Sequence, residues 1–319
     1  MNRPADQLAI AVAQLNSTVG DIAGNAEKVR RARAQAASQG ADLVVFPELF
    51  IAGYPPEDLV LKPAFQAACR AAVEQLARET AAPGPALVVG TPWLDDGKLY
   101  NAVALLDGGA IAALRFKVDL PNYGVFDEKR VFVPGPMPGP VNFRGARLGL
   151  PICEDVWGEE VVECLAETGA ELLIVPNGSP YWREKGDVRL NVAVARVTEQ
   201  SLPMVYVNLV GGQDELVFDG VSFGLHADRS LAFQLRRFTR RSSPSAGDAR
   251  ARPGAARTLP RFPRSKAIRP TTPPACWACA TTSTRTVFPA SCSGSPAASI
   301  PRSARRWRSM RWGPSGCAA

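Results

Sequence analysis

Among its 319 residues the sequence contains a single histidine, His226. Histidine-based metal sites and Cys–His catalytic pairs therefore lack candidate residues, and we expect no bound metal. No stretch approaches the roughly 20 consecutive apolar residues that a membrane-spanning helix requires. The opening residues also lack a hydrophobic segment followed by a small-residue cleavage site. We therefore expect a cytoplasmic protein that makes no contact with a membrane.

Cysteine is sparse as well, with seven residues at irregular spacing. An odd number without regular spacing argues against a secreted disulfide framework. Cys276 and Cys279 have C-x-x-C spacing, but no second pair and no histidine follow them, so this pair does not predict a zinc site.

Acidic residues are almost absent from the last quarter of the chain. From Arg236 onward 17 Lys and Arg accompany one acid, Asp248, whereas residues 1–235 contain 29 acids and 20 basic residues. Residues 236–319 also hold 11 prolines and show no sustained period of 2 or 3.6. We therefore expect a globular domain over 1–235, followed by a tail that is disordered or poorly packed.

The change of composition after Leu235 is abrupt. It suggests the hypothesis that a GC-rich gene is read in a shifted frame from this point. An intact reading frame in the coding DNA would overturn this hypothesis.

Residues 1–235 alternate apolar segments with amphipathic ones. Strands are expected over 8–15, 42–46, 86–90, 100–106, 110–118, 171–176, 203–210, 221–226 and 231–235. Helices are expected over 25–38 with Asn25 as N-cap, from Pro63 onward, and over 158–168 and 187–200. Residues 120–140 and 213–219 are expected as loops. The alternation predicts an α/β domain with a mixed sheet, or two stacked sheets between helix layers.

The stretch Arg147–Trp157, R-L-G-L-P-I-C-E-D-V-W, places Cys153 where an apolar strand ends ahead of an amphipathic helix. Such a corner predicts an exposed side chain beside free backbone N–H groups, which favour the thiolate. A half-buried structural cysteine is the alternative. Glu154 and Asp155 are expected to shape the turn.

Two more polar residues follow apolar strands, namely Glu48 after L-V-V-F-P and Lys117 after L-R-F. Residues at strand ends can converge on one edge of a layered α/β domain. A carboxylate, an ammonium and a thiol gathered there could act as base, oxyanion stabiliser and nucleophile. Each is also explained as a cap or a solvated charge, so spacing alone leaves their role open.

These residues resemble a known family. The chain is similar to the nitrilase (carbon–nitrogen hydrolase) superfamily, whose members share a Glu–Lys–Cys triad in this order. Within it, the chain resembles the glutaminase domain of bacterial glutamine-dependent NAD⁺ synthetases, over about Leu8 to Leu235. The segments that carry the resemblance are A-Q-L-N-S-T-V-G-D-I-A-G-N (13–25), V-V-F-P-E-L-F-I-A-G-Y-P-P-E-D-L (44–59), K-V-D-L-P-N-Y-G-V-F-D-E-K-R (117–130), G-L-P-I-C-E-D-V-W (149–157), P-N-G-S-P-Y-W (176–182) and V-N-L-V-G-G-Q-D-E-L-V-F-D-G (207–220).

The resemblance implies a four-layer α-β-β-α sandwich with two mixed sheets between helix layers. It also implies that Cys153 attacks the carboxamide of L-glutamine and forms a thioester. Glu48 would carry the proton, and Lys117 would stabilise the oxyanion together with backbone N–H groups after the cysteine. Glu128 would be a second acid that positions the lysine and the substrate.

By the same resemblance Tyr123, Ser179 and Lys185 would hold the glutamine. Gly178 and Glu184 depart from the usual family pattern, and they put Lys185 most in doubt. The glutaminase reaction would need no cofactor, and the chain would form a homo-oligomer through nitrilase-type interfaces.

A full-length enzyme of this kind would continue into a synthetase domain that uses ATP, Mg²⁺ and deamido-NAD⁺. No S-G-G-x-D-S-like loop follows Leu235, so we expect hydrolysis of glutamine and no synthesis of NAD⁺. One alternative is an amidase of the same superfamily that acts on another small amide. Another is a non-catalytic protein whose basic tail binds nucleic acid, a partner that we do not expect.

Overall fold

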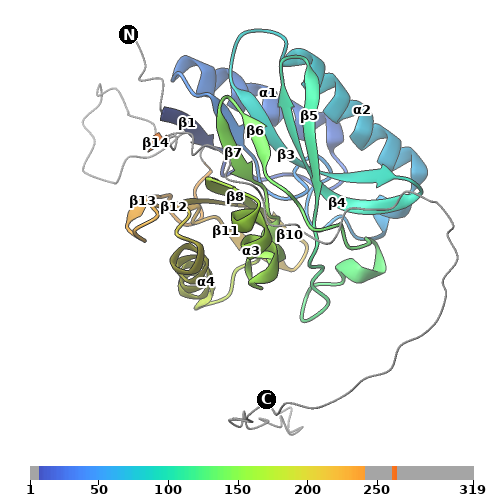
Figure 1. The fold of residues 1–319 in the computed structure, drawn as a ribbon. Coiled ribbons are helices and arrows are strands. Elements are labelled where there is room, and N and C mark those ends of the chain that lie inside the picture. Colours follow the sequence, from blue (N-terminus) through green and yellow to red (C-terminus); the bar gives the residue numbers. More distant parts are fainter. Residues whose placement is uncertain (1–6, 241–260, 264–319) are drawn as a thin grey trace, which may run out of the picture. The chain divides into compact units, whose positions relative to one another are not determined.

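The computed structural model describes residues 7–240 and 261–263 (Figure 1). By its internal contacts the chain divides into two units, Met1–Ile268 and Arg269–Ala319, and every described residue belongs to the first. The predictions for 241–260 and 264–319, including those for the C-x-x-C pair, lie outside the described residues. The boundary after Leu235 stays a prediction.

Two six-stranded sheets form the centre of the domain, with a separate hairpin beside them. The first sheet has the order β14-β1-β2-β3-β4-β5, and its strands are β1 (Gln7–Val12), β2 (Leu43–Val45), β3 (Ala86–Asp95), β4 (Lys98–Asp107), β5 (Ala110–Phe116) and β14 (Arg261–Pro263). The second has the order β13-β12-β9-β8-β7-β6, with β6 (Val141–Phe143), β7 (Ala146–Gly149), β8 (Leu172–Asn177), β9 (Met204–Asn208), β12 (Phe223–Leu225) and β13 (Leu231–Gln234). The hairpin consists of β10 (Val210–Gln213) and β11 (Leu216–Asp219).

Helices cover the outer face of each sheet (Figure 1). The helices on the first sheet are α1 (Ile22–Ser38) and α2 (Pro63–Glu79), and those on the second are α3 (Glu160–Glu167) and α4 (Lys185–Gln200). Short 3₁₀ helices lie in the connections: η1 (Glu57–Leu61), η2 (Glu128–Arg130) and η3 (Cys153–Val156). The predicted four-layer α-β-β-α sandwich is confirmed.

Both sheets are mixed, and they share one pairing pattern. In the first sheet β1, β2 and β3 pair in parallel, with antiparallel strands on either side. In the second sheet β7, β8 and β9 are the parallel core, again with antiparallel neighbours. Each parallel pair is joined through one of the four helices, because a parallel connection must cross over the sheet. The two halves of the sandwich therefore repeat one topology without a visible sequence repeat.

Three apolar clusters separate the four layers, and single strands contribute to two of them. On β2 the side chain of Val44 belongs to the cluster under α1 and α2, whereas Leu43 and Val45 pack between the sheets. On β8 Ile174 packs between the sheets and Val175 under α3 and α4. Successive side chains point to opposite faces of a strand. Strands covered on both faces are therefore apolar almost throughout, as the sequence shows.

The predicted start of the first helix is wrong. Helix α1 begins at Ile22, and its N-cap is Asp21, whose Oδ1 accepts a hydrogen bond from Gly24 N at 2.9 Å. Asn25 is buried inside the helix and donates through Nδ2 to the carbonyls of Thr18 and Ile51. A side chain that binds loop carbonyls from inside a helix carries the same polar signal as a cap.

The prediction of a loop over 213–219 is also wrong, because β10 and β11 form an antiparallel hairpin with Gln213 opposite Leu216. The predicted hairpin formed by 221–226 and 231–235 is confirmed as β12 and β13. Strand β3 continues past the predicted end at Gly90 to Asp95 and forms a long hairpin with β4.

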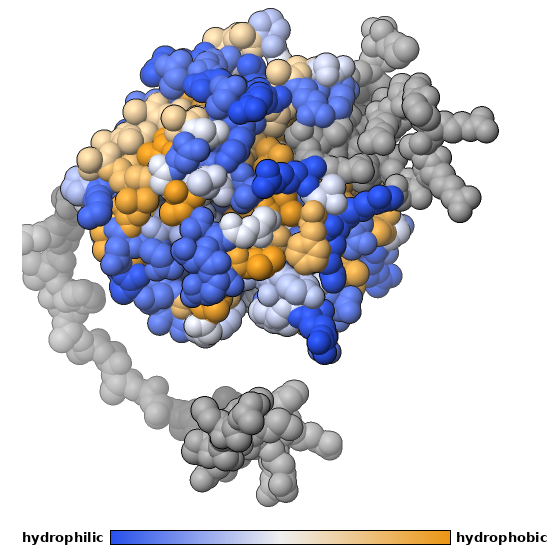
Figure 2. Space-filling view, turned by 180° about the vertical axis from the view of Figure 1, so that it is seen from behind, coloured by the Kyte–Doolittle hydropathy of each residue, from blue (hydrophilic) through white to orange (hydrophobic). Residues whose placement is uncertain are grey.

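Within the described residues no helix is long and apolar enough to cross a membrane. The rear face of the domain intersperses hydrophilic and hydrophobic residues (Figure 2).

Candidate active site

Glu48 lies just beyond the carboxyl end of β2 and is completely buried. Its Oε1 accepts hydrogen bonds from Lys117 Nζ at 2.7 Å and from Asn101 Nδ2 at 2.8 Å. Its Oε2 accepts one from the backbone N–H of Gly178 at 2.7 Å. Asn101 lies within β4, whereas Lys117 and Gly178 directly follow β5 and β8, so three separate segments of the fold hold the carboxylate in place.

The segment around Glu48 needs a glycine on the neighbouring strand. A Cβ on Gly90 of β3 would lie 2.4 Å from Leu49 N and 2.7 Å from Pro47 O. Leu49 itself has a φ of 46°, a conformation that costs a non-glycine residue energy. Close backbone packing therefore turns the Glu48 side chain inward at the end of β2.

Lys117 follows β5, and its buried ammonium lies between two carboxylates. In addition to Glu48, its Nζ is 2.8 Å from Glu128 Oε1 and 2.9 Å from Oε2. Burial works against the charged form of Lys117, but the charges of Glu128 and Glu48 raise its pKa well above the ordinary value. The lysine is therefore a fixed cation throughout the neutral range.

Cys153 is the first residue of η3 and packs in the cluster between the sheets, with 3% of its surface exposed. The prediction of an exposed thiol is therefore wrong. Burial and the charge of Glu48 raise the pKa of Cys153 well above its ordinary value, although Lys117 lowers it. The prediction that the corner favours the thiolate is wrong as well. A resting thiol needs a base, and the structure brings a carboxylate into this region.

The backbone at Cys153 is in the left-handed region, with a φ of 46°. Asp155 holds this turn: its Oδ2 accepts from Ile152 N at 2.8 Å, and its Oδ1 accepts from the N–H groups of Val118 and Asp119 at 2.9 and 2.8 Å. The same carboxylate thus ties the cysteine turn to the segment that follows Lys117. The structure agrees with the expectation that Asp155 shapes the turn.

Glu128, at the start of η2, completes the buried charge cluster. Its Oε1 accepts from Tyr54 OH at 3.0 Å, in addition to both contacts with Lys117. Burial raises the pKa of Glu128, the lysine lowers it, and Glu48 raises it further. Two carboxylates share one ammonium here, which favours a proton on the pair when the lysine is removed.

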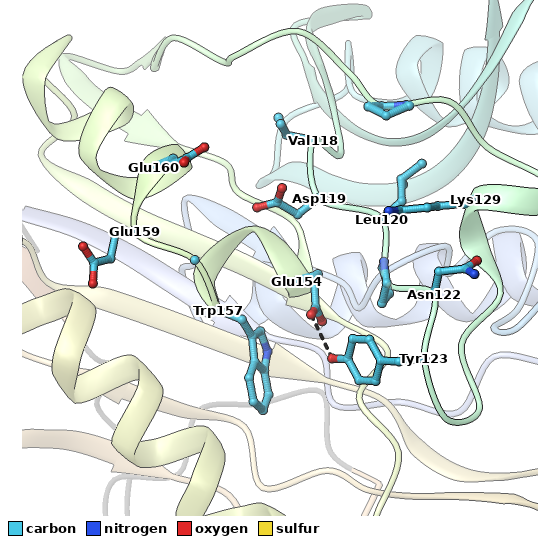
Figure 3. Close-up of a pocket in the computed structure, with 13 residues that line it drawn as sticks. Val118, Asp119, Leu120, Asn122, Tyr123, Lys129, Glu154, Trp157, Glu159 and Glu160 are labelled. Carbon is cyan, nitrogen blue, oxygen red and sulfur yellow. Dashed lines mark hydrogen bonds between the residues drawn. The ribbon is translucent and has the colours of Figure 1, made fainter. Parts of the chain in front are cut away.

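Tyr123 and Glu154 lie beside an open cavity of about 860 Å³ (Figure 3). The Tyr123 hydroxyl donates to Glu154 Oε1 at 2.8 Å, and half of the tyrosine surface is exposed. Cys153 is not part of the cavity lining, although Glu154 is its neighbour in sequence. Val118, the neighbour of Lys117 in sequence, lines the same cavity, so residues adjacent to both Lys117 and Cys153 form part of its wall.

Ser179 follows β8 and is buried. Its backbone N–H donates to Asn208 Oδ1 at 2.9 Å, and its Oγ accepts from Arg189 Nε at 3.0 Å. It therefore lies in the same turn as Gly178, the donor to Glu48.

Lys185, the first residue of α4, is held between two indole rings. Its Nζ is 4.2 Å from the ring centre of Trp157 and 3.6 Å from that of Trp182. Burial and the nearby charge of Arg189 lower its pKa to about 8, although Cys153 and Glu154 raise it. An ammonium with such a pKa loses its charge just above neutral pH.

The structure thus brings Glu48, Lys117 and Glu128 into direct contact and places Cys153 within their electrostatic influence. The sequence did not predict that Tyr54, Asn101, Arg189 and Asp219 belong to this region. It also did not predict that Asp155 binds the backbone that follows Lys117. For Arg189 a signal existed, because it occupies the buried stripe of α4 where an apolar residue is expected. Within 7–240 and 261–263, no group of three or more His, Cys, Asp or Glu could hold a metal ion.

Comparison with known proteins finds the same domain elsewhere. The profile of the family described as "Carbon-nitrogen hydrolase" matches residues 9–240. The glutamine-dependent NAD(+) synthetase of Rhodobacter capsulatus is 48% identical over 233 residues, which are 73% of this chain and 42% of that protein. This chain therefore spans less than half the length of that curated relative.

Solved structures agree. The glutamine-dependent NAD⁺ synthetase of Acinetobacter baumannii in complex with ADP has a TM-score of 0.70 at 36% identity, covering 74% of this chain and 44% of that one. A variant of the amidase from Nesterenkonia sp. AN1 has a TM-score of 0.66 at 29% identity, covering 77% of this chain and 90% of the amidase. The latter shows the acetamide moiety of fluoroacetamide added covalently at that protein's active-site cysteine.

Proposed function

Because this chain belongs to the carbon–nitrogen hydrolase family and is an enzyme of that class, we propose that it hydrolyses the side-chain amide of L-glutamine through a thioester on Cys153. The ammonia released would serve the synthesis of NAD⁺ from deamido-NAD⁺ in a longer enzyme. The observation that carries this proposal is the buried contact of Glu48 with Lys117 at 2.7 Å, whose charges both act on Cys153.

In the first half-reaction the Cys153 thiol gives its proton to Glu48, and the sulfur attacks the carboxamide carbon. The carbonyl oxygen becomes an oxyanion, which the Lys117 ammonium and backbone N–H groups after Cys153 stabilise. The C–N bond then breaks, Glu48 returns its proton to the nitrogen, and ammonia leaves. The raised pKa of the cysteine supports this route, because it requires the base to act during the attack.

In the second half-reaction Glu48 takes a proton from water, and the hydroxide attacks the thioester carbon. The C–S bond breaks, the proton returns to sulfur, and glutamate leaves. Glu128 stays in contact with Lys117 at 2.8 Å and holds the ammonium in place as charge develops. No cofactor takes part in these steps.

Substrate binding is proposed for Tyr123, Ser179 and Lys185. Lys185 supplies a positive charge for the α-carboxylate of glutamine, and its indole cage limits the movement of the ammonium. Tyr123 and Glu154 line the cavity from which the amino acid would approach. We also propose that the chain forms a homo-oligomer.

The test is hydrolysis of L-glutamine by the full chain, followed as release of glutamate and ammonia. Equal molar amounts of both products are expected. Hydrolysis of D-glutamine and L-asparagine should be at least about tenfold slower, because the first displaces the α-charged groups and the second displaces the amide relative to Cys153. Trapping with hydroxylamine should yield γ-glutamyl hydroxamate from the thioester. Turnover of simple aliphatic amides with no turnover of glutamine would contradict the proposal.

A second candidate is hydrolysis of another small amide. It is favoured by the match to the Nesterenkonia amidase, which extends over 90% of that protein. Acetamide and propionamide, assayed beside glutamine at equal concentrations, separate the two candidates through their ratio of kcat/KM. Binding of nucleic acid by the basic tail is a third hypothesis, and a salt-sensitive mobility shift tests it on the same preparation.

The lowered pKa of Lys185 predicts a pH dependence of substrate binding. Below about pH 8 the ammonium is charged and pairs with the carboxylate, and above it the charge is lost. KM for glutamine is therefore expected to rise about tenfold per pH unit above this value. In Lys185→Arg the guanidinium stays charged, so this rise should be absent.

The matched control is Lys62→Arg, because Lys62 is exposed in the connection between η1 and α2, outside the residues proposed to bind glutamine. Its KM profile should follow that of the wild type. The α-ammonium of glutamine titrates equally in all three proteins, so only a difference between them concerns Lys185. An identical rise of KM in Lys185→Arg would remove this residue from the binding site.

A further inference from the structure

The turn after β8 lies between the aromatic ring of Tyr54 and the side chain of Arg189. A Cβ on Gly178 would lie 2.7 Å from the Tyr54 ring, so the backbone of this turn lies close to the ring and leaves no room for a larger residue. The N–H of the same glycine donates to Glu48 Oε2 at 2.7 Å. Any displacement of this turn would therefore move a hydrogen-bond donor of the carboxylate.

Arg189 clamps the turn from the side of α4. Its Nη2 donates to the carbonyls of Ser179 and Pro180 at 2.7 and 2.9 Å, and its Nε donates to Ser179 Oγ at 3.0 Å. Only 1% of the arginine surface is exposed. A planar guanidinium can bind several acceptors of one turn at fixed angles, which a lysine ammonium cannot reproduce.

Asp219, at the end of β11, holds the guanidinium in this position. Its Oδ1 accepts from Arg189 Nη1 at 2.6 Å, and its carboxylate is completely buried. Its second oxygen lies 3.5 Å from Arg237 Nε. A buried ion pair is a poor source of stability compared with apolar packing, so its geometry points to a role in positioning.

We infer that the Arg189–Asp219 pair is a positioning device for Glu48, acting through the turn of Gly178 and Ser179. This inference rests on the proposed function, since it takes Glu48 as the base for Cys153. Neither residue lines the cavity beside Tyr123 and Glu154. Loss of the guanidinium contacts should let the turn move, weaken the Gly178 hydrogen bond and misdirect the carboxylate.

The test is the rate at which iodoacetamide alkylates Cys153 in the full chain, read by peptide mass spectrometry at this cysteine. In Arg189→Lys the positive charge that pairs with Asp219 remains, but the guanidinium hydrogen bonds to Ser179 and Pro180 are lost. Alkylation should be about tenfold slower than in the wild type. A matched control is Arg196→Lys, two turns further along α4, where the arginine pairs with Glu199 and does not touch the turn. It should react at the wild-type rate.

If Arg189 only stabilises the fold, the effects of Arg189→Lys and Glu48→Gln on the alkylation rate should multiply. If Arg189 positions the base, they should not. In a Glu48→Gln background, Arg189→Lys should therefore slow alkylation by less than about twofold. A further tenfold loss in that background, or a wild-type rate for the single variant, overturns the inference. If Arg189→Lys does not fold, Asp219→Asn replaces it: its amide oxygen still accepts from Arg189 without the charge, and a loss of about threefold is expected, again absent beside Glu48→Gln.

Failure of the inference and failure of the proposed function give different results. If Glu48→Gln reacts as fast as the wild type, the base assignment is wrong and the proposed mechanism falls. If Glu48→Gln is slow but Arg189→Lys is not, only the positioning role falls. Alkylation does not depend on which amide is the substrate, so it remains informative if glutamine is not hydrolysed.

Discussion

Replacing Cys153 by alanine is expected to lower kcat for glutamine by at least about 10⁴-fold, because the substitution removes the sulfur that is proposed to attack the amide carbon. The loss should not be one of folding. The cysteine has a φ of 46°, and its thiol fills only a small part of the cluster between the sheets. Activity is measured as ammonia release, and folding as the urea midpoint of the same preparations.

The matched control is Cys153→Gly. Glycine adopts a positive φ without strain, whereas the same conformation costs other residues about 1–3 kcal/mol. The glycine variant should therefore unfold at an equal or higher urea concentration than the alanine variant, while both stay inactive. An alanine variant that keeps more than about 1% of the wild-type rate would show that Cys153 is not the nucleophile.

The fold could be predicted from local patterns to a large extent. Apolar runs such as those of β2 and β8 are buried on both faces, and their length and composition mark them as strands without any knowledge of the partner. The arrangement in four layers came from the resemblance of specific segments. Errors arose where a polar side chain binds groups outside its own helix, as Asn25 does with Ile51.

From the sequence it could be predicted that Glu48, Lys117 and Cys153 converge, but not that all three are buried. Glu48, Lys117 and Cys153 each follow a strand, which a sequence displays. Their burial depends on contacts across the fold: Asn101 is 53 residues from Glu48, and Gly178 is 130 residues from it. A local pattern carries no information about contacts between residues so far apart in the sequence. The burial of Cys153 could therefore not be predicted, and the exposed, ionised thiol expected there was wrong.

The charge balance of the site follows from the same long-range packing. Three of its charged groups are almost completely buried, namely Glu48, Lys117 and Glu128. Burial alone disfavours all three charges, and only their mutual contact keeps the lysine protonated. Removing any one of these groups should therefore change the charge balance of the site. Removing Lys117 should have the largest effect, because it contacts both carboxylates.

Replacing Lys117 by methionine is accordingly expected to reduce both stability and activity. It leaves Glu48 and Glu128 buried beside each other without a cation, which should lower the free energy of unfolding by about 3–5 kcal/mol at pH 8. It also removes the group proposed to stabilise the oxyanion, which should lower kcat by about 10²–10³-fold. Urea denaturation and ammonia release measure the two effects separately.

The pH dependence of this loss has a definite sign. The raised pKa of Lys117 means that its stabilising contribution is complete below the ordinary lysine value and is lost only at higher pH. In the methionine variant the raised pKa of Glu128 lets the folded state bind a proton that the unfolded state binds less readily. Lowering the pH from 8 toward 5 should therefore recover part of the lost stability, whereas the wild type gains nothing from Lys117 over this range.

The double variant Lys117→Met/Glu128→Gln separates folding from chemistry. Its glutamine amide carries no charge, so Glu48 is the one carboxylate of the pair left without a cation, and it keeps its hydrogen bonds from Asn101 and Gly178. Most of the stability should therefore return at pH 8, while hydrolysis stays as low as in Lys117→Met. Lys98→Met, at an exposed position of β4, is the control and should match the wild type in both assays. Return of activity in the double variant would mean that Lys117 only neutralises Glu128, and its role at the oxyanion would be refuted.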